Sequence, residues 1–372
     1  MDNINKLLGA VAIGAAALTI GYVTTVKAAD LGGHCCADLE ERTAELEATT
    51  ARKGNRKMSL TVYGQVNQAV LWVDSPEVSK KSIVNNTNSQ GRFGFVGEAK
   101  ISPGWAAGYL LEVGTAGPPV EGGSSPPYAL SIRHSALWVR ADNIGTVWLG
   151  KTSTATDGIA EINVSNADVA STVLSFEPLS GAYGAPTLPY DGNREEVLKF
   201  TTASFAGFTA SAAWFGNKND AWDIALRWKG EGAGFRGAAG IGYRNENDGI
   251  TTVNAKTLAG SASAMHIASG IFLTAGYGDL RGSVFTLPAT FTDIRAAHVQ
   301  AGIEQKWAPL GITTLYAEVG RIKADGGQSD YWGFGAVQKI DAAAMDVYLS
   351  FRSYDKDLFD ARVVTAGGII RF

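Results

Sequence analysis

From residue 58 to the C terminus, the chain alternates apolar and polar residues in long runs that are separated by short clusters of turn residues. In the first run, Val62 and Val66 share one face of an extended strand, and Tyr63 and Gln65 share the other. A period of two residues is the signature of a β-strand whose two faces meet different surroundings. Strands of soluble sandwiches are usually only about 5–6 residues long, so these runs indicate strands that cross a lipid bilayer.

The number and spacing of these runs determine the expected fold. We count about sixteen runs, and their connections alternate between short turns and longer loops, as in bacterial outer-membrane barrels. An even number of strands brings both ends of the barrel to the periplasmic side, and closure leaves no unpaired strand edge in lipid. We therefore predict an all-β fold, a 16-stranded antiparallel transmembrane β-barrel over residues 58–372. The alternative, a soluble sandwich, is disfavoured because one core cannot cover so many long apolar faces.

The alternation is interrupted most strongly between Lys151 and Asn193. This stretch contains acids but no base after Lys151; the acids are Asp157, Glu161, Asp168, Glu177 and Asp191. A connection of about 40 residues without regular structure is unusual in a compact domain and is usually functional or disordered. We expect residues 151–193 to be a loop folded into the barrel lumen, the third loop of the barrel. A surface loop or a flexible insertion is the alternative.

A second, weaker interruption lies between residues 245 and 297. Alternation persists there only in short pieces, which predict strands near 261–268 and 271–279. The remaining residues, 280–296, are predicted to form a loop.

The N-terminal residues precede the alternating pattern and have a different character. Residues 1–28 are expected to be a secretory signal peptide, because Lys6 precedes an apolar run and residues 26–28 (Val-Lys-Ala) are similar to a cleavage site. A retained anchor helix is the alternative, but the apolar run is of marginal length for a membrane span. Residues 29–57 are expected to form a periplasmic helical segment with a short heptad stripe, either a small oligomeric coil or a solvated spacer.

The polar faces of the predicted strands carry mixed charge. They contain Gln65, Arg92, Glu98, Lys100, Glu112, Arg133, Lys199, Arg227 and Arg244. With lipid outside, these faces line a water-filled lumen that suits small polar solutes. Arg92 faces inward on parity, because Phe93 and Phe95 lie on the opposite face, whereas the strand of Arg133 is apolar on both faces. We therefore expect Gln65, Glu98, Lys100 and Glu112 to line the lumen.

Residues that usually carry catalysis or metal binding are not arranged for either task. The four His residues, at positions 34, 134, 266 and 298, show no metal-ligand spacing, and the sequence has no nucleophile elbow or phosphate-binding glycine loop. We expect no enzyme activity, no catalytic or metal site and no cofactor. A net charge of −4 does not favour binding to nucleic acid. Cys35 and Cys36 either cross-link chains or are a fortuitous pair, because the chain has no further Cys.

Several motifs together resemble one protein family. Residues 35–42 read Cys-Cys-Ala-Asp-Leu-Glu-Glu-Arg, residues 48–57 read Ala-Thr-Thr-Ala-Arg-Lys-Gly-Asn-Arg-Lys, and the first strand contains Leu-Thr-Val-Tyr-Gly-Gln-Val-Asn. The second strand contains Arg92-Phe-Gly-Phe-Val-Gly-Glu98. On these motifs the chain resembles the general diffusion porins of Gram-negative outer membranes, most closely the alphaproteobacterial branch.

The resemblance implies a charged constriction in the lumen. General porins place a row of arginines on the barrel wall, which faces acids on the third loop. By motif position the basic row is Arg92, Arg133 and Arg194, and the loop acids best placed to face it are Asp157, Glu161 and Asp168. Gln65 departs from the pattern, since some general porins have Lys there, and this weakens the row by one charge. Arg194 shares its parity with outward-facing Leu198, so it requires a bulge or a place on the rim.

The resemblance also implies a function and a setting. The chain is expected to be a passive channel for small hydrophilic solutes and ions, exported to the cell outer membrane, surrounded by outer-membrane lipid and assembled as a homotrimer. The C-terminal Phe372 is expected to be read by the barrel-assembly machinery. The alternatives are a substrate-selective, sugar-type channel and a structural barrel that anchors the envelope. We rank the sugar-type channel second because the inward faces are poor in aromatic residues, apart from Tyr63 and Tyr348.

Overall fold

The fold is taken from a computed structural model of the chain. It describes residues 57–76, 79–116, 129–171, 190–216, 221–247, 254–286, 289–324, 327–355 and 360–372. The expected signal peptide, almost all of the expected periplasmic segment and the two Cys residues lie outside these ranges. Among the described residues, no helix has the length and hydropathy needed to cross a membrane.

Nearly all described residues belong to antiparallel strands. From the N terminus these are β1 (Thr61–Asp74), β2 (Ser79–Asn85), β3 (Arg92–Ser102), β4 (Trp105–Ala116), β5 (Ala129–Ala141), β6 (Gly145–Ser153), β7 (Arg194–Thr202) and β8 (Phe208–Phe215). They are followed by β9 (Trp222–Gly232), β10 (Phe235–Asn247), β11 (Asn254–His266), β12 (Ile271–Thr286), β13 (Ala289–Ala308), β14 (Gly311–Ala324), β15 (Gly327–Ile340), β16 (Met345–Asp355) and β17 (Ala361–Arg371). Short 3₁₀ turns are η1 (Thr87–Ser89), η2 (Asn166–Val169) and η3 (Asp341–Ala343).

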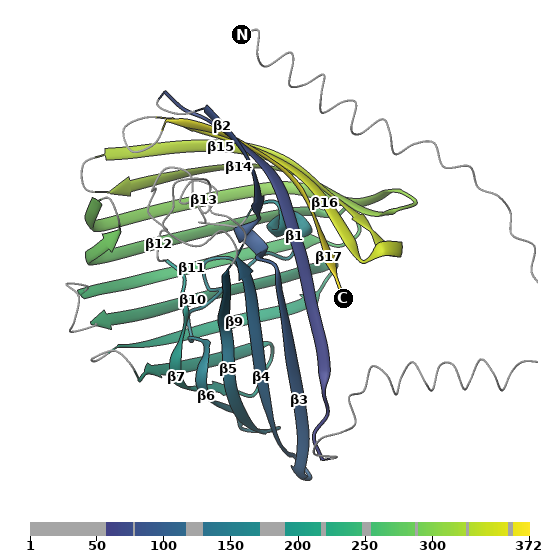
Figure 1. The fold of residues 1–372 in the computed structure, drawn as a ribbon, viewed down its shortest axis with the longest axis vertical. Helices are drawn as coiled ribbons and strands as arrows, with labels where there is room; N and C mark the ends of the chain where they lie inside the picture. Colours follow the sequence, from purple (N-terminus) through teal and green to yellow (C-terminus); the bar gives the residue numbers. More distant parts are fainter. Residues whose placement is uncertain are drawn as a thin grey trace, which may run out of the picture. The chain divides into compact units, whose positions relative to one another are not determined.

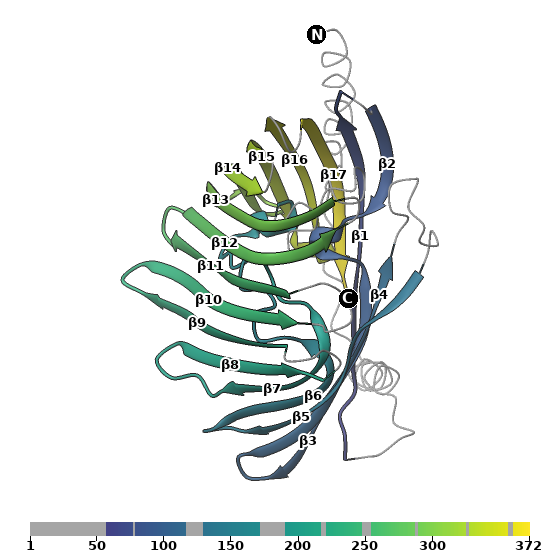
Figure 2. The ribbon, with the colours of Figure 1, turned by 90° about the vertical axis from the view of Figure 1, so that its left-hand side faces the viewer.

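The sheet closes on itself. Successive strands pair with each other, except that β2 and β3 both pair with β1, and β1 also pairs with β17, so the last strand meets the first (Figures 1 and 2). The strands β2 and β3 occupy one position beside β1, because Val70 of β1 pairs with Ile83 and Val62 pairs with Phe95. In the described part of the chain the closed barrel therefore has sixteen strand positions, which confirms the predicted fold.

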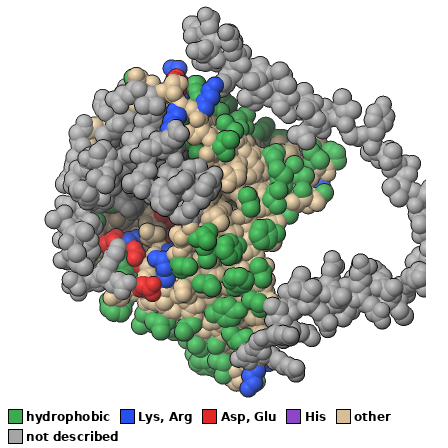
Figure 3. Space-filling model, in the orientation of Figure 1, with side chains coloured by type: hydrophobic (Ala, Val, Ile, Leu, Met, Phe, Trp, Pro, Cys, Tyr) green, Lys and Arg blue, Asp and Glu red, His purple; other side chains and the backbone are tan. Residues whose placement is uncertain are grey.

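The two faces of the wall differ as the alternation predicts. Along β1, Val66 and Val70 are 56% and 53% exposed, whereas the intervening Asn67 and Ala69 are 0% and 3% exposed. An exposed apolar residue at every second position forms a band that suits lipid. In Figure 3 hydrophobic side chains cover much of the visible surface, and Lys and Arg side chains lie near its upper and lower ends and, beside Asp and Glu side chains, at mid-height on the left. The inner face carries the polar and small residues that contact the loop inside the barrel.

The loop predicted at residues 280–296 is wrong. Strand β12 continues to Thr286, and β13 begins at Ala289. In this part of the hairpin the outward positions hold charged residues, and Asp279 lies 3.1 Å from Arg281 and 3.6 Å from Arg295. The pair between Asp279 and Arg295 joins the two strands, and opposite charges across a ladder stabilise it. Leu280 and Ile294 remain buried on the inner face, so the strand persists after its outward apolar alternation has ended. The neighbouring prediction of strands near 261–268 and 271–279 agrees with β11 and the first part of β12.

Candidate functional site

The loop after β6 lies inside the barrel. The carboxylate of Asp223, on the inner face of β9, accepts hydrogen bonds from the backbone N–H groups of Ala155 and Thr156, at 2.9 and 2.8 Å. Two strands further round the wall, the Oγ of Ser261 accepts from the N–H of Ile162 at 2.9 Å. These inward contacts confirm that the third loop folds into the lumen.

The loop then continues along the wall to β14. Asn163 donates to the side chain of Gln300 at 2.9 Å, and the N–H of Asn166 donates to Glu304 at 2.9 Å. The loop can approach the inner wall closely where small residues line it. At Gly240 an added Cβ would lie 2.6 Å from Ile159 of the loop, so any larger side chain there would displace the loop.

The far end of the described loop is held by a buried ion pair. Ser171 donates to a carboxylate oxygen of Glu318 at 2.6 Å, and Arg352 donates to the other oxygen at 2.8 Å. Arg352 also donates to the hydroxyl of Ser171 at 2.6 Å. Both charged residues belong to the wall, on β14 and β16, and the hydroxyl of Ser171 joins the end of the described loop to them.

Two residues of the predicted basic row share one carboxylate on the opposite wall. Glu112 on β4 accepts a hydrogen bond from Arg133 at 2.6 Å and lies 3.8 Å from Arg92. It also accepts from the hydroxyl of Tyr63 at 2.8 Å. The structure therefore brings Arg92 and Arg133 together, with Glu112 between them. The sequence pattern had predicted only that Glu112 lines the lumen.

A β-bulge explains the inward position of Arg133. Glu112 pairs with His134, but the next residue, Val113, pairs with Ile132, so Arg133 is the extra residue. An extra residue shifts the parity of a strand, and both Arg133 and His134 face the lumen. The ring of His134 is 3.0 Å from the hydroxyl of Thr152. Beyond the bulge Ala136 and Trp138 are buried on the inner face, while Leu137 and Val139 face outward, so the strand reads as apolar on both faces.

Arg194 completes the row without a bulge. It is the first residue of β7 and pairs with Ser153 in a regular register. Its guanidinium lies 3.7 Å from the carboxylate of Asp157 in the loop. Parity required either a bulge or a place on the rim for Arg194. The structure shows no bulge here, and Arg194 lies at the end of its strand.

The loop acids are used in different ways. Asp157 faces Arg194, whereas Asp191 accepts hydrogen bonds from the N–H groups of Gly158 and Ala160 at 2.7 and 2.9 Å. Glu161 and Asp168 are exposed. Asp168 lies in η2, a turn that contacts β14, β15 and η1.

The remaining predicted lining residues lie at different heights along the wall. Gln65 is buried and donates to the hydroxyl of Ser89 at 2.9 Å. Glu98 and Lys100 are exposed near the end of β3, where Glu98 accepts from Arg140 at 2.9 Å.

Buried inward aromatic residues were missed. Tyr316, Tyr331 and Tyr354 are only 5%, 3% and 2% exposed and project from inner positions of β14, β15 and β16. The expectation of an inner face poor in aromatics is therefore wrong for this part of the wall. The signal was present in the alternation, since Tyr316 stands between the outward residues Leu315 and Ala317. These rings are packed against the wall, so they do not form an exposed ladder.

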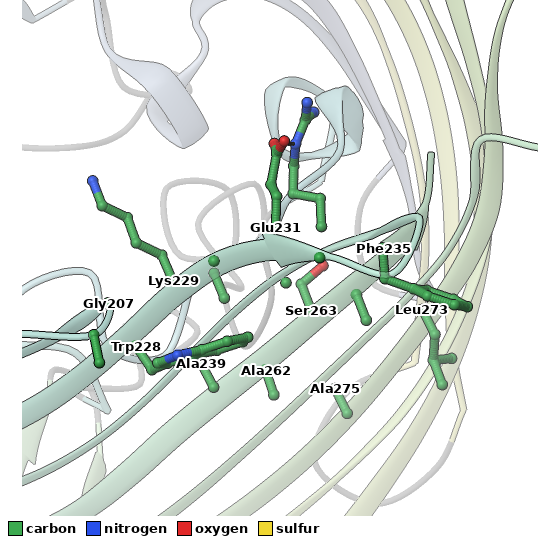
Figure 4. A pocket seen from close by; sticks show the side chains of 17 residues that line it. Gly207, Trp228, Lys229, Glu231, Phe235, Ala239, Ala262, Ser263, Leu273 and Ala275 are labelled. Carbon is green, nitrogen blue, oxygen red and sulfur yellow. Dashed lines mark hydrogen bonds and ion pairs between the residues drawn. The ribbon is translucent and has the colours of Figure 1, made fainter. Parts of the chain in front are cut away.

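One recess on the surface of the described residues lies outside the lumen. It has a volume of about 840 Å³, and its lining includes Trp228, Phe235 and Leu273. Figure 4 shows the side chain of Lys229 on one side of the sheet. On the other side lie the rings of Trp228 and Phe235 together with the side chains of Leu273, Ala239, Ala262 and Ala275. The recess is a shallow groove of small residues on the outer face and contributes nothing to the lumen. Within the described ranges, no group of His, Cys, Asp and Glu side chains is placed to hold a metal ion.

Comparisons with known proteins point in one direction. A family model described as Gram-negative porin matches residues 10–358. A search of curated proteins by sequence finds no significant match. Among solved structures, the anion-selective porin of Comamonas acidovorans is 15% identical with a TM-score of 0.59, and the alignment covers 85% of this chain and 100% of that one. OmpF of Salmonella typhi is 14% identical with a TM-score of 0.58, covering 85% and 98%. At these identities the structural likeness concerns the fold alone.

Proposed function

The chain belongs to the family of Gram-negative porins, and on that basis we propose that it is a passive diffusion channel of the outer membrane rather than an enzyme. Its solutes are small hydrophilic molecules and ions. The observation that carries this function is the loop hydrogen-bonded along the inner wall from β9 to β14. A loop in that position narrows a water-filled barrel, so passage is limited by size and needs no energy coupling.

We further propose that the narrowest point is charged on both sides. The basic side comprises Arg92, Arg133 and Arg194, and the acidic side comprises Asp157, Glu161 and Asp168. The distance of 3.7 Å between Arg194 and Asp157 supports this assignment, because it places the two charges at one level of the lumen. Low-dielectric walls focus the field between such charges, which favours polar solutes over apolar ones.

Recordings from single channels in a planar bilayer test both parts of the proposal. Purified protein should open steady, passive pores. The double change Arg92→Gln with Arg133→Gln should move the reversal potential under a salt gradient toward cation selectivity, and Asp157→Asn with Glu161→Gln and Asp168→Asn should move it toward anion selectivity. A protein that opens no pores would refute the function.

A matched control separates the charge at the constriction from charge in general. Arg321 is exposed on the outer face of β14 and pairs with Asp330 at 2.6 Å. Arg321→Gln removes one positive charge from the wall without touching the lumen, so the reversal potential should stay unchanged. If Arg321→Gln moves selectivity as much as a single change in the row, the row is not the selectivity element.

The remaining expectations concern assembly and origin. We propose that the chain is made with the signal peptide 1–28, carries the periplasmic segment 29–57 and assembles as a homotrimer. Solved porin-fold neighbours include a trimer form of the Vibrio cholerae outer-membrane protein OmpT, at 15% identity and a TM-score of 0.56. The basis for proposing the alphaproteobacterial branch is the motif at residues 35–42, together with the motif at residues 48–57 and the first strand.

A further inference from the structure

A short turn interrupts the wall beside the arginine row. Gln65 of β1 pairs with Arg92, but Gln68 pairs with Asn85, so residues 86–91 leave the sheet opposite only two residues of β1. Neither the alternation nor the motifs of the sequence predicted this break. The turn contains η1 and contacts η2 of the loop, so it projects into the lumen.

Buried amide side chains hold this turn in place. Asn67 donates to the carbonyl of Ser89 at 2.9 Å, and Gln65 donates to the carbonyl of Gln90 at 2.9 Å. Both amides are nearly inaccessible, at 0% and 7% exposure. Asn86 caps η1 by accepting from the N–H of Asn88 at 3.0 Å, and it donates to the hydroxyl of Tyr348 on β16 at 2.8 Å. A short turn with this many buried partners is rigid.

The turn makes one contact to each side of the constriction. Toward the loop, the Nδ2 of Asn88 donates to the carbonyl of Ala170 at 3.1 Å. This is the residue before Ser171, which is held by Glu318 on β14 and Arg352 on β16. Toward the basic row, the Oε1 of Gln90 accepts from Nη1 of Arg133 at 3.1 Å. The end of the loop is thus held by the turn as well as by β14 and β16, and the turn also contacts Arg133.

We propose that residues 86–91 form an inner clasp that positions the end of the loop and Arg133 together, with Asn88 and Gln90 as the positioning residues. This inference rests on the proposed function as a channel. Because buried hydrogen bonds fix the clasp to β1 and β16, it sets how far the loop end can move and therefore how steady the open passage is. A barrel of the same fold without the clasp would hold this end of the loop from β14 and β16 only.

Changing the donor of Asn88 tests the clasp. Asn88→Asp keeps the shape but removes the N–H donor, and Asn88→Ala removes the side chain. Loss of one hydrogen bond should raise the population of the detached loop end by about 2- to 10-fold, seen as a matching rise in brief closures of single channels. Asn88→Gln, which keeps an amide donor, should restore part of the steadiness. The control Asn143→Ala, in the exposed turn after β5, should behave like the unchanged protein.

Two outcomes would overturn the clasp. One is a closure rate in Asn88→Asp and Asn88→Ala equal to that of Asn143→Ala, in barrels that still show heat-modifiable migration. The second concerns the pair Asn88→Cys and Ala170→Cys, in a chain whose Cys35 and Cys36 are changed to Ser. A short bifunctional thiol reagent should cross-link this pair and lower the closure rate, and no cross-link would refute the contact even if Asn88→Ala fails to assemble. Either result would leave the proposed channel function intact. That function would be refuted only if the unchanged protein opened no pores.

Discussion

Glu112 illustrates how one side chain changes the charge of a lumen wall. It sits between Arg92 and Arg133, at 3.8 and 2.6 Å, and so offsets part of the basic row. We predict that Glu112→Gln shifts the reversal potential toward anions, because both guanidinium groups lose their counter-charge. Glu98→Gln, which alters a pair with Arg140 near the end of β3, should cause a smaller shift. A shift of Glu112→Gln toward cations would contradict this role.

Asp191 should make the loop sensitive to pH. Burial, with the nearby charge of Asp157, raises its pKa from 3.8 to about 7, while its hydrogen bonds from Gly158 and Ala160 act in the opposite direction. The guanidinium of Arg227 is the positive charge nearby. Below about pH 4 the carboxyl is protonated in the folded and the unfolded chain, so ionisation carries no penalty.

As the pH rises from about 4 to 7, the unfolded chain releases this proton first, and the folded loop loses stability. Closures of single channels should therefore become more frequent as the pH increases over this range. Asp191→Asn has no proton to release and should remove this part of the pH dependence. Closures that become rarer with rising pH in the unchanged protein, and not in Asp191→Asn, would reverse the sign of the argument.

At the scale of elements, the seam between β1 and β17 depends on the last residue. The backbone of Phe372 exchanges two hydrogen bonds with Gly64, at 2.9 and 3.0 Å. The ring covers Gly64, where an added Cβ would lie 2.4 Å from it. Each backbone hydrogen bond contributes about 0.5–1.5 kcal/mol to stability, and an unpaired edge in lipid costs more.

Deleting Phe372 should therefore lower both the amount of assembled protein and the temperature at which the barrel unfolds. Phe372→Ala keeps the backbone bonds and should lose less stability, although it removes the aromatic terminus that the assembly machinery is expected to read. Gel migration of heated and unheated membranes measures both variants. Equal levels of assembled protein in the deletion and the unchanged chain would contradict the prediction.

The loop is the element that should control conductance. Residues 159–164 follow the wall from β11 to β13 through Ile159, Ile162 and Asn163. Deleting them should widen the passage, so the single-channel current should increase while the far-UV spectrum stays that of a β-barrel. An unchanged current from a folded barrel would mean that this stretch does not limit flow.

For the whole molecule, the assembly can be tested without recordings. A closed barrel leaves no unpaired strand edges, so unheated protein should migrate as a compact species and heated protein as an extended one. Cross-linking should yield trimers if the proposed assembly is correct. A soluble monomer, or a helical far-UV spectrum, would contradict the prediction.

Strand positions and faces were predictable because each residue of a strand contributes independently to an alternation of period two. Val66 outward and Arg92 inward follow from parity alone. The continuation of β12 beyond residue 279 was not predictable, because charged residues, among them the cross-strand pair Asp279 and Arg295, replace apolar side chains at its outward positions. The inward turn of Arg133 depends on a bulge, which shifts parity without a mark in the residue types.

The sequence by itself determined the class of fold, the lipid-facing surface and the place of the interrupted stretch, since these follow from local patterns of hydropathy. Only the tertiary structure decided which charges meet. Glu112 with Arg133, Asp157 with Arg194 and Asn88 with Ala170 are far apart in the chain or separated by a change of strand. Such contacts depend on register, bulges and closure of the whole sheet. The turn at residues 86–91 is likewise recognised only from the strand pairing on either side of it.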